Sequence, residues 1–161
     1  DSERNEQTSF EKRITFETFK EMASNAELSR YEKIGFPDDY RENYEKNIFD
    51  NIVKILRLER EKISIFDIGC GCSELPNFII QNSIEHNQSL YLVDSDEMLF
   101  HLPEYSNIVK IGAKFPEEID LQKYTNGVDV IILYSVLQHI ILDMNPFYFI
   151  DKVLSLLNIG A

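Results

Sequence analysis

The sequence has no tryptophan, only two cysteines and no long apolar run among its 161 residues. Two cysteines cannot build the disulfide network of a small secreted domain, so we expect a reducing compartment, the cytoplasm. No stretch reaches the roughly 18 consecutive apolar residues of a membrane span. The polar start DSERNEQTS lacks the pattern of a secretory signal. These absences predict a soluble cytoplasmic protein that does not act at a membrane.

Basic residues are scarce in the second part of the chain. Residues 63–161 contain four lysines and no arginine against 13 acidic residues, and the whole chain carries a formal net charge of −12. The basic residues of the first part are interleaved with acidic ones. A nucleic-acid binder needs clustered lysine and arginine side chains to neutralise phosphates. We therefore expect no nucleic-acid partner.

The apolar content is that of an ordinary globular domain, with 43% hydrophobic residues, 11 phenylalanines and 8 tyrosines. Residues 1–9 read as a disordered tail. Apolar spacing predicts helices over 10–28 and 41–61, separated by an aromatic turn at 31–40 that contains Gly-Phe-Pro. We assign residues 1–62 to an N-terminal tail and a helical lid.

From residue 63 onward, short apolar runs alternate with helical patterns. The predicted strands are 63–68, 89–94, 107–111 and 128–134, and the predicted helices or helical turns are 74–84, 96–102, 117–124 and 146–157. Such alternation implies right-handed crossovers and a parallel sheet. The expected fold class is α/β, a Rossmann-like, doubly wound parallel sheet preceded by helices.

A glycine turn follows the first predicted strand, in the sequence FDIGCGCSEL at residues 66–75. Gly69 and Gly71 can take dihedral angles that other residues avoid and let a ligand approach the backbone. In open parallel sheets, ligands bind beyond the carboxyl ends of the strands. Glu74 occupies the third-glycine position of the dinucleotide fingerprint, which disfavours an NAD-dependent oxidoreductase.

Asp94 ends the second predicted strand, 23 residues after Gly71. A carboxylate at this position can accept hydrogen bonds from both hydroxyls of a ribose. Alternatively, Asp94, Ser95 or Asp96 caps the helix that follows. The location directly after a strand favours the ribose role.

Four segments together resemble class I S-adenosylmethionine-dependent methyltransferases, in the family's order and spacing. They are 67–71 (DIGCG), 92–96 (LVDSD), 128–140 (VDVIILYSVLQHI) and 156–161 (LLNIGA). The resemblance covers residues 63–161 and implies that the cofactor is S-adenosyl-L-methionine. It implies a cofactor site formed by Asp67, Gly69, Cys70, Gly71, Asp94, Ser95, Gly112, Ala113 and Tyr134. Relatives often carry an acid after the third strand that contacts adenine. This chain has none there, so we expect the adenine to contact backbone groups instead, those of Gly112 or Ala113.

The acceptor is indicated only by resemblance. The Asn/Asp-Pro-Pro-Tyr/Phe motif of amine-methylating enzymes is absent, and the fourth-strand sequence is most similar to small-molecule and sugar methyltransferases. Residues 29–37 (SRYEKIGFP) resemble methyltransferases of bacterial surface-glycan pathways. His139 is the candidate general base for a hydroxyl acceptor, or else a residue that only packs at a helix start. A non-catalytic cofactor-binding module is the alternative function.

Three further features allow two interpretations each. Cys70 and Cys72 have no second cysteine pair and no nearby histidine, so we expect small buried side chains and no metal site. The tyrosines before the sheet, Tyr31, Tyr40 and Tyr44, belong either to a lid over the cofactor or to the core. The sequence ends before the fifth strand that the resemblance implies. Either the chain is a fragment, or a second copy pairs with the exposed edge of the fourth strand to form a homo-oligomer.

Overall fold

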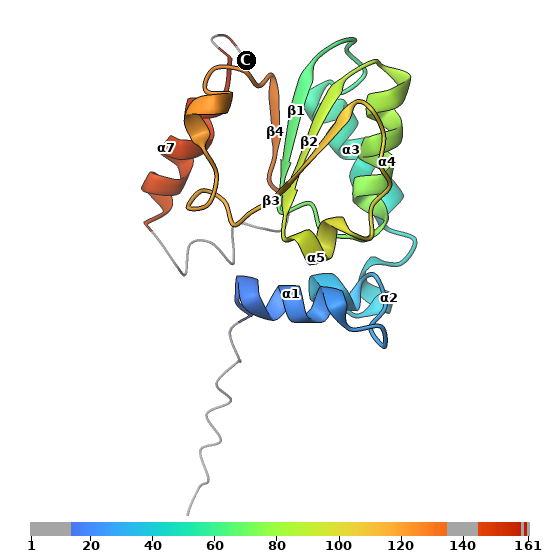
Figure 1. Ribbon diagram of the computed structural model, residues 1–161. Helices are drawn as coiled ribbons and strands as arrows, with labels where there is room; N and C mark the ends of the chain where they lie inside the picture. The colour runs from blue at the N-terminus through green and yellow to red at the C-terminus, as the bar shows by residue number, and fades with distance from the viewer. Residues whose placement is uncertain (1–13, 135–144, 159, 161) are drawn as a thin grey trace, which may run out of the picture.

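The computed structural model describes residues 14–134, 145–158 and 160. Its centre is a four-stranded sheet with the order β3-β2-β1-β4 (Figure 1). The strands, all parallel to their neighbours, are β1 (Ser64–Ile68), β2 (Ser89–Asp94), β3 (Ile108–Gly112) and β4 (Val130–Ile132). This arrangement confirms the predicted α/β parallel sheet.

Helices cover both faces of this sheet. α3 (Glu45–Leu56) and α4 (Glu74–Glu85) lie on one face, and α7 (Pro146–Leu156) lies on the other (Figure 1). The side chains of β1 alternate between these two layers, as the period of a strand requires. Ile65 joins the core cluster beneath α3 and α4, whereas Phe66 and Ile68 pack with residues of α7. The two faces are the structural basis of the doubly wound fold.

The N-terminal helices lie across the carboxyl ends of the strands (Figure 1). They are α1 (Phe16–Ser24), the 3-10 helix η1 (Glu32–Ile34) and α2 (Asp38–Arg41). The structure has a shorter helix, α1, where the sequence predicts one over 10–28. This helix ends at Ser24, because the next residue, Asn25, has extended dihedral angles. The predicted helix 41–61 is wrong as one unit, because Asn43 takes a φ of 64° between α2 and α3, and Arg57 takes a φ of 53° after α3. Asparagine tolerates this left-handed conformation better than most residues.

Two short helices complete the described elements. α5 (Asp96–Leu99) follows β2 and is shorter than the predicted 96–102, and η2 (Leu121–Tyr124) is a 3-10 turn before β4. The η2 residue Tyr124 packs edge-on against Phe66 of β1, with ring centroids 5.1 Å apart. None of the described helices is long and apolar enough to cross a membrane.

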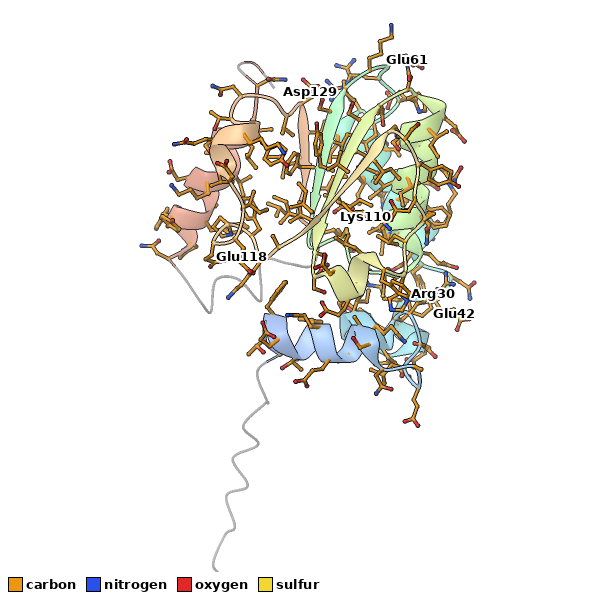
Figure 2. The ribbon with its side chains drawn as sticks, viewed as in Figure 1. Arg30, Glu42, Glu61, Lys110, Glu118 and Asp129 are labelled. Atoms are coloured by element: carbon orange, nitrogen blue, oxygen red, sulfur yellow. The ribbon has the colours of Figure 1, made fainter. Side chains whose placement is uncertain are left out.

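The chain just before β4 pairs with the segment that follows α7. Val128 forms a parallel bridge with Leu157, and Asn158 donates its backbone N–H to the Val128 carbonyl at 2.7 Å. Asp129, at the upper end of the sheet in Figure 2, accepts hydrogen bonds from Asn158 and from the Ser64 backbone. β4 itself spans three residues and is shorter than the predicted 128–134. Pairing of this edge with a second copy stays a prediction.

A buried carboxylate ties the N-terminal helices to the sheet domain. Glu45, at the start of α3, is fully buried and accepts a hydrogen bond from the Leu75 backbone N–H at 2.7 Å. It also forms an ion pair of 3.0 Å with the buried Arg41. Ser73, the cap residue of α4, makes no side-chain capping bond. Glu45 therefore satisfies a backbone donor at the start of α4 from another helix.

We expect Glu45→Ala to reduce the free energy of unfolding by about 3–5 kcal/mol, because it removes the carboxylate partner of a buried arginine. Urea unfolding followed by circular dichroism measures the change. Glu42→Ala, an exposed glutamate three residues earlier, is the matched control and should change stability by less than about 0.5 kcal/mol. Equal stabilities of the two variants would contradict a clamp role for Glu45.

Candidate functional site

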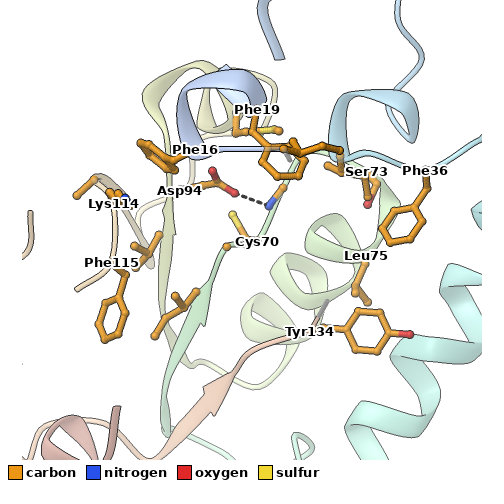
Figure 3. Close-up of a pocket in the computed structure, with 18 of the residues that line it drawn as sticks. Phe16, Phe19, Phe36, Cys70, Ser73, Leu75, Asp94, Lys114, Phe115 and Tyr134 are labelled. Carbon is orange, nitrogen blue, oxygen red and sulfur yellow. Dashed lines mark hydrogen bonds between the residues drawn. The ribbon is translucent and has the colours of Figure 1, made fainter. Parts of the chain in front are cut away.

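A pocket lies between the carboxyl ends of the strands and the N-terminal helices (Figure 3). It encloses about 1020 Å³, including the part that opens to solvent. Its walls are mainly apolar, and among the residues that the structure describes, the charged side chains that line it are Arg41, Asp94 and Lys114. A concave, mostly apolar cavity with a few polar groups is typical of a small-molecule site.

The glycine turn after β1 forms the floor of this pocket. Gly69 and Gly71 have φ angles of 68° and 67°, in the left-handed region that glycine alone enters without strain. A Cβ atom added to Gly71 would lie 2.7 Å from Cγ2 of Ile34 in η1. The close approach of the N-terminal segment therefore also requires glycine here.

Asp94 joins the end of β2 to this glycine turn. Its Oδ2 accepts a hydrogen bond from the Gly71 backbone N–H at 2.9 Å, drawn in Figure 3, and its Oδ1 accepts one from the Ser95 N–H at 2.7 Å. The cap of α5 is Ser95, whose hydroxyl accepts a hydrogen bond from the Met98 N–H. The Asp94 side chain is thus not the cap of this helix, and it faces the pocket.

Two acidic side chains lie close together behind the turn. Burial raises the pKa of Asp94 to about 6. Burial also raises the pKa of Asp67 to about 7, and the charge of Asp94 adds to this rise. Burial makes the negative charge of each carboxylate unfavourable. A positively charged ligand beside them would offset this cost and would therefore be stabilised. Perturbed acids beside a pocket are typical of functional sites.

Six of the nine predicted cofactor residues line the pocket: Gly69, Cys70, Gly71, Asp94, Ala113 and Tyr134. Asp67, Ser95 and Gly112 do not line it. Asp67 is 5% exposed beneath the turn. At Gly112, an added Cβ would collide with the carboxylate of Asp96, so this glycine lies against α5 instead. The candidate base His139 lies outside the described residues.

Cys70 and Cys72 are free cysteines within the glycine turn. Burial raises the pKa of the Cys70 thiol well above its ordinary value and that of Cys72 to about 11. These raised pKa values favour the protonated thiol form of both side chains. Within the described ranges, no group of three or more histidine, cysteine, aspartate or glutamate side chains could hold a metal ion.

Several lining residues were not predicted from the sequence. Phe16 and Phe19 of α1 lie over the pocket (Figure 3). Met98, Phe115 and Arg41 are also among its lining residues. In the sequence, the phenylalanines follow the same helical spacing as core residues, so no signal separated the two roles. Arg41 lies in a run of charged residues that reads as solvated surface.

The three N-terminal tyrosines do not line the pocket. Tyr31 is buried, and burial together with the neighbouring Glu74 carboxylate raises its pKa to about 12. Tyr40 and Tyr44 are 66% and 57% exposed. Tyr31 therefore belongs to the core, whereas α1 supplies the aromatic cover of the pocket.

The chain is similar in fold to two solved structures. One is a protein of Methanococcus maripaludis assigned as an S-adenosyl-L-methionine-dependent methyltransferase, with TM-score 0.57, 15% identity, and 91% of this chain and 61% of that chain covered. The other is an S-adenosylmethionine-dependent methyltransferase of Aquifex aeolicus, with TM-score 0.57, 15% identity, and 81% and 69% covered. This chain shares the Rossmann-like α/β fold of these two structures. No protein-family model and no curated protein matches its sequence.

We expect Asp67→Asn to flatten the dependence of stability on pH between about 4 and 7. The folded protein keeps the Asp67 proton up to about pH 7, whereas the unfolded chain loses it near pH 4. Wild-type stability therefore falls as pH rises through this window. Asparagine has no proton to lose in this pH range. At pH 8 the free energy of unfolding of the variant should therefore exceed that of wild type by on the order of 2 kcal/mol.

Thermal unfolding at pH 4.5, 6 and 8 measures this difference, with the exposed Asp39→Asn as the control. A variant whose stability changes with pH in parallel with wild type would show that Asp67 is ionised in the folded protein throughout.

Proposed function

We propose that this protein binds S-adenosyl-L-methionine in the pocket and transfers its methyl group to a small-molecule or sugar acceptor. The observation that carries the proposal is the Asp94 carboxylate, which lines an otherwise mostly apolar pocket beside the glycine turn. Two carboxylate oxygens can accept two ribose hydroxyls at the end of β2. The similarity of fold to solved methyltransferases supports the choice of this cofactor.

Besides the ribose, the purine and the sulfonium of this cofactor can also be matched to described residues. Ala113, Phe115 and Phe16 offer flat apolar walls for a purine beside β3. Asp94 lines the pocket, where a sulfonium cation would relieve the cost of its burial. Gly69 and Gly71, which carry no side chain, line the pocket together with Asp94. Glu74, at the third-glycine position, would repel the pyrophosphate of NAD.

The bound cofactor supplies an electrophilic methyl group, and the protein holds the methyl group and the acceptor in position relative to each other. Most of the rate enhancement of such a transfer can come from holding the acceptor atom in line with that group. Phe16 and Phe19 of α1 cover one side of the pocket. If the acceptor is a hydroxyl, His139 is the proposed base that takes its proton. A sugar acceptor in bacterial surface-glycan synthesis is the class that the resemblance of residues 29–37 favours.

We expect calorimetric titration to show binding of S-adenosylhomocysteine and no binding of NAD. S-adenosylhomocysteine keeps the adenosine and the amino-acid part of the donor, so it tests the pocket without turnover. Binding of NAD alone would reject the methyltransferase proposal. A protein that binds S-adenosylhomocysteine yet never methylates candidate acceptors would support the non-catalytic alternative.

Asp94→Ala should weaken S-adenosylhomocysteine binding by about 1–3 kcal/mol, the usual loss for a hydrogen bond to a charged group. Asp94→Asn is the companion variant, because it keeps the side-chain size and removes the charge. The affinity of the wild type should also rise from pH 5 to pH 7, since the Asp94 pKa is about 6. Unchanged affinity in both variants would remove Asp94 from the ribose site.

A further inference from the structure

Lys114 is the charged residue that the described part of the chain places in the pocket beside β3. It lies two residues after the end of this strand and lines the pocket together with Ala113 and Phe115. In Figure 3 it lies on the same side of the pocket as Phe16 and Phe115. The proposed function places the purine of the methyl donor against these apolar walls. The long side chain of Lys114 can therefore reach an edge of that purine.

The ammonium group of Lys114 is available to a ligand. The backbone N–H of this residue donates to Oε1 of Glu118 at 2.8 Å. Within the described ranges, no hydrogen bond or ion pair joins its Nζ to another residue. Arg41, the other cation that lines the described pocket, is already paired with the Glu45 carboxylate at 3.0 Å. Lys114 is thus the cation of the described walls that a ligand can engage without displacing a protein partner.

The acidic side chains near this end of the pocket contact other groups. The carboxylate of Asp96 lies against Gly112, and that of Glu118 accepts the backbone N–H described above. Neither of these two acids lines the pocket. Asp94 does line it, but its oxygens lie at the glycine turn and the start of α5, where the proposed function places the ribose. On the described walls, the side chain placed to meet the base is therefore a donor and not an acceptor.

The chemistry of Lys114 selects among purines by the group at position 6. Adenine presents an amine donor there, beside the acceptor N7, whereas a 6-oxo purine presents two acceptors, O6 and N7. Lysine is a common partner of O6 and N7, whereas amide side chains pair with the amine and N7 of adenine. We propose that Lys114 sets the base specificity of this pocket, so that a ligand with a 6-oxo purine binds at least as well as its adenine counterpart. This inference rests on the proposed function.

The test compares two ligands by calorimetry. S-adenosylhomocysteine carries adenine, and S-inosylhomocysteine is the same molecule with hypoxanthine, a 6-oxo purine, in place of adenine. The two share the ribose, the thioether and the amino-acid part, so the ratio of their dissociation constants reports on the base alone. We expect wild type to bind S-inosylhomocysteine at least as tightly as S-adenosylhomocysteine.

Two variants of Lys114 change what the base meets. Lys114→Gln replaces the ammonium by an amide, which can accept the adenine amine, so the ratio should shift by roughly tenfold in favour of S-adenosylhomocysteine. Lys114→Met keeps a long unbranched side chain without its charge. It should weaken S-inosylhomocysteine and leave S-adenosylhomocysteine within about twofold of wild type.

Two further variants are controls. Lys123→Gln removes an exposed lysine of η2 that does not line the pocket, and it should leave both affinities unchanged. Asp96→Asn removes the acid that lies against Gly112. It should leave the ratio of the two affinities unchanged.

Three outcomes overturn the proposal. Wild type could bind S-adenosylhomocysteine more than about threefold tighter than S-inosylhomocysteine, the Lys114 variants could keep the wild-type ratio, or Asp96→Asn could shift the ratio and thereby assign the base to Asp96. If wild type binds neither ligand, the proposed function itself fails and the Lys114 proposal fails with it. If wild type binds S-adenosylhomocysteine, the proposed cofactor site stands, and the ratio decides only the role of Lys114.

Discussion

The candidate site depends on one half-buried carboxylate at the end of β2. Because β1 and β2 are parallel neighbours, their carboxyl ends meet, and Asp94 reaches the backbone N–H of Gly71 in the turn after β1. This bond shapes the turn, and it places a negative charge beside the turn in the pocket. The same burial that raises the pKa of Asp94 makes the site receptive to cationic or hydroxyl-bearing ligands.

The N-terminal helices are part of the site and not an appendage to it. Ile34 packs so closely on Gly71 that a methyl group would not fit, and α1 places two phenylalanines over the pocket. Glu45 fixes both the start of α4 and the guanidinium of Arg41. The helices before the sheet therefore supply the roof and one charged wall, while the strand ends supply the floor.

The sheet was predictable because its signals are local. Continuous apolar runs such as 64–68, followed by glycines and alternating with helices, have few other interpretations. Asp94 could be predicted as a site residue because it stands at the end of a predicted strand, and ligands bind at the carboxyl ends of parallel strands. Arg41 and Phe16 were missed because pocket lining is set by tertiary packing, and their local patterns match a charged surface and a helical core face. The contact of Gly112 with Asp96 of α5 could not be predicted, because the sequence does not show that this side chain folds back against the end of β3.

The most direct test is a crystal structure of the protein with S-adenosylhomocysteine. The account predicts both ribose hydroxyls within hydrogen-bond distance, roughly 2.5–3.0 Å, of the Asp94 carboxylate, with the purine against Ala113 and Phe115. A ribose placed away from Asp94, or a ligand bound outside the pocket beneath α1, would contradict it.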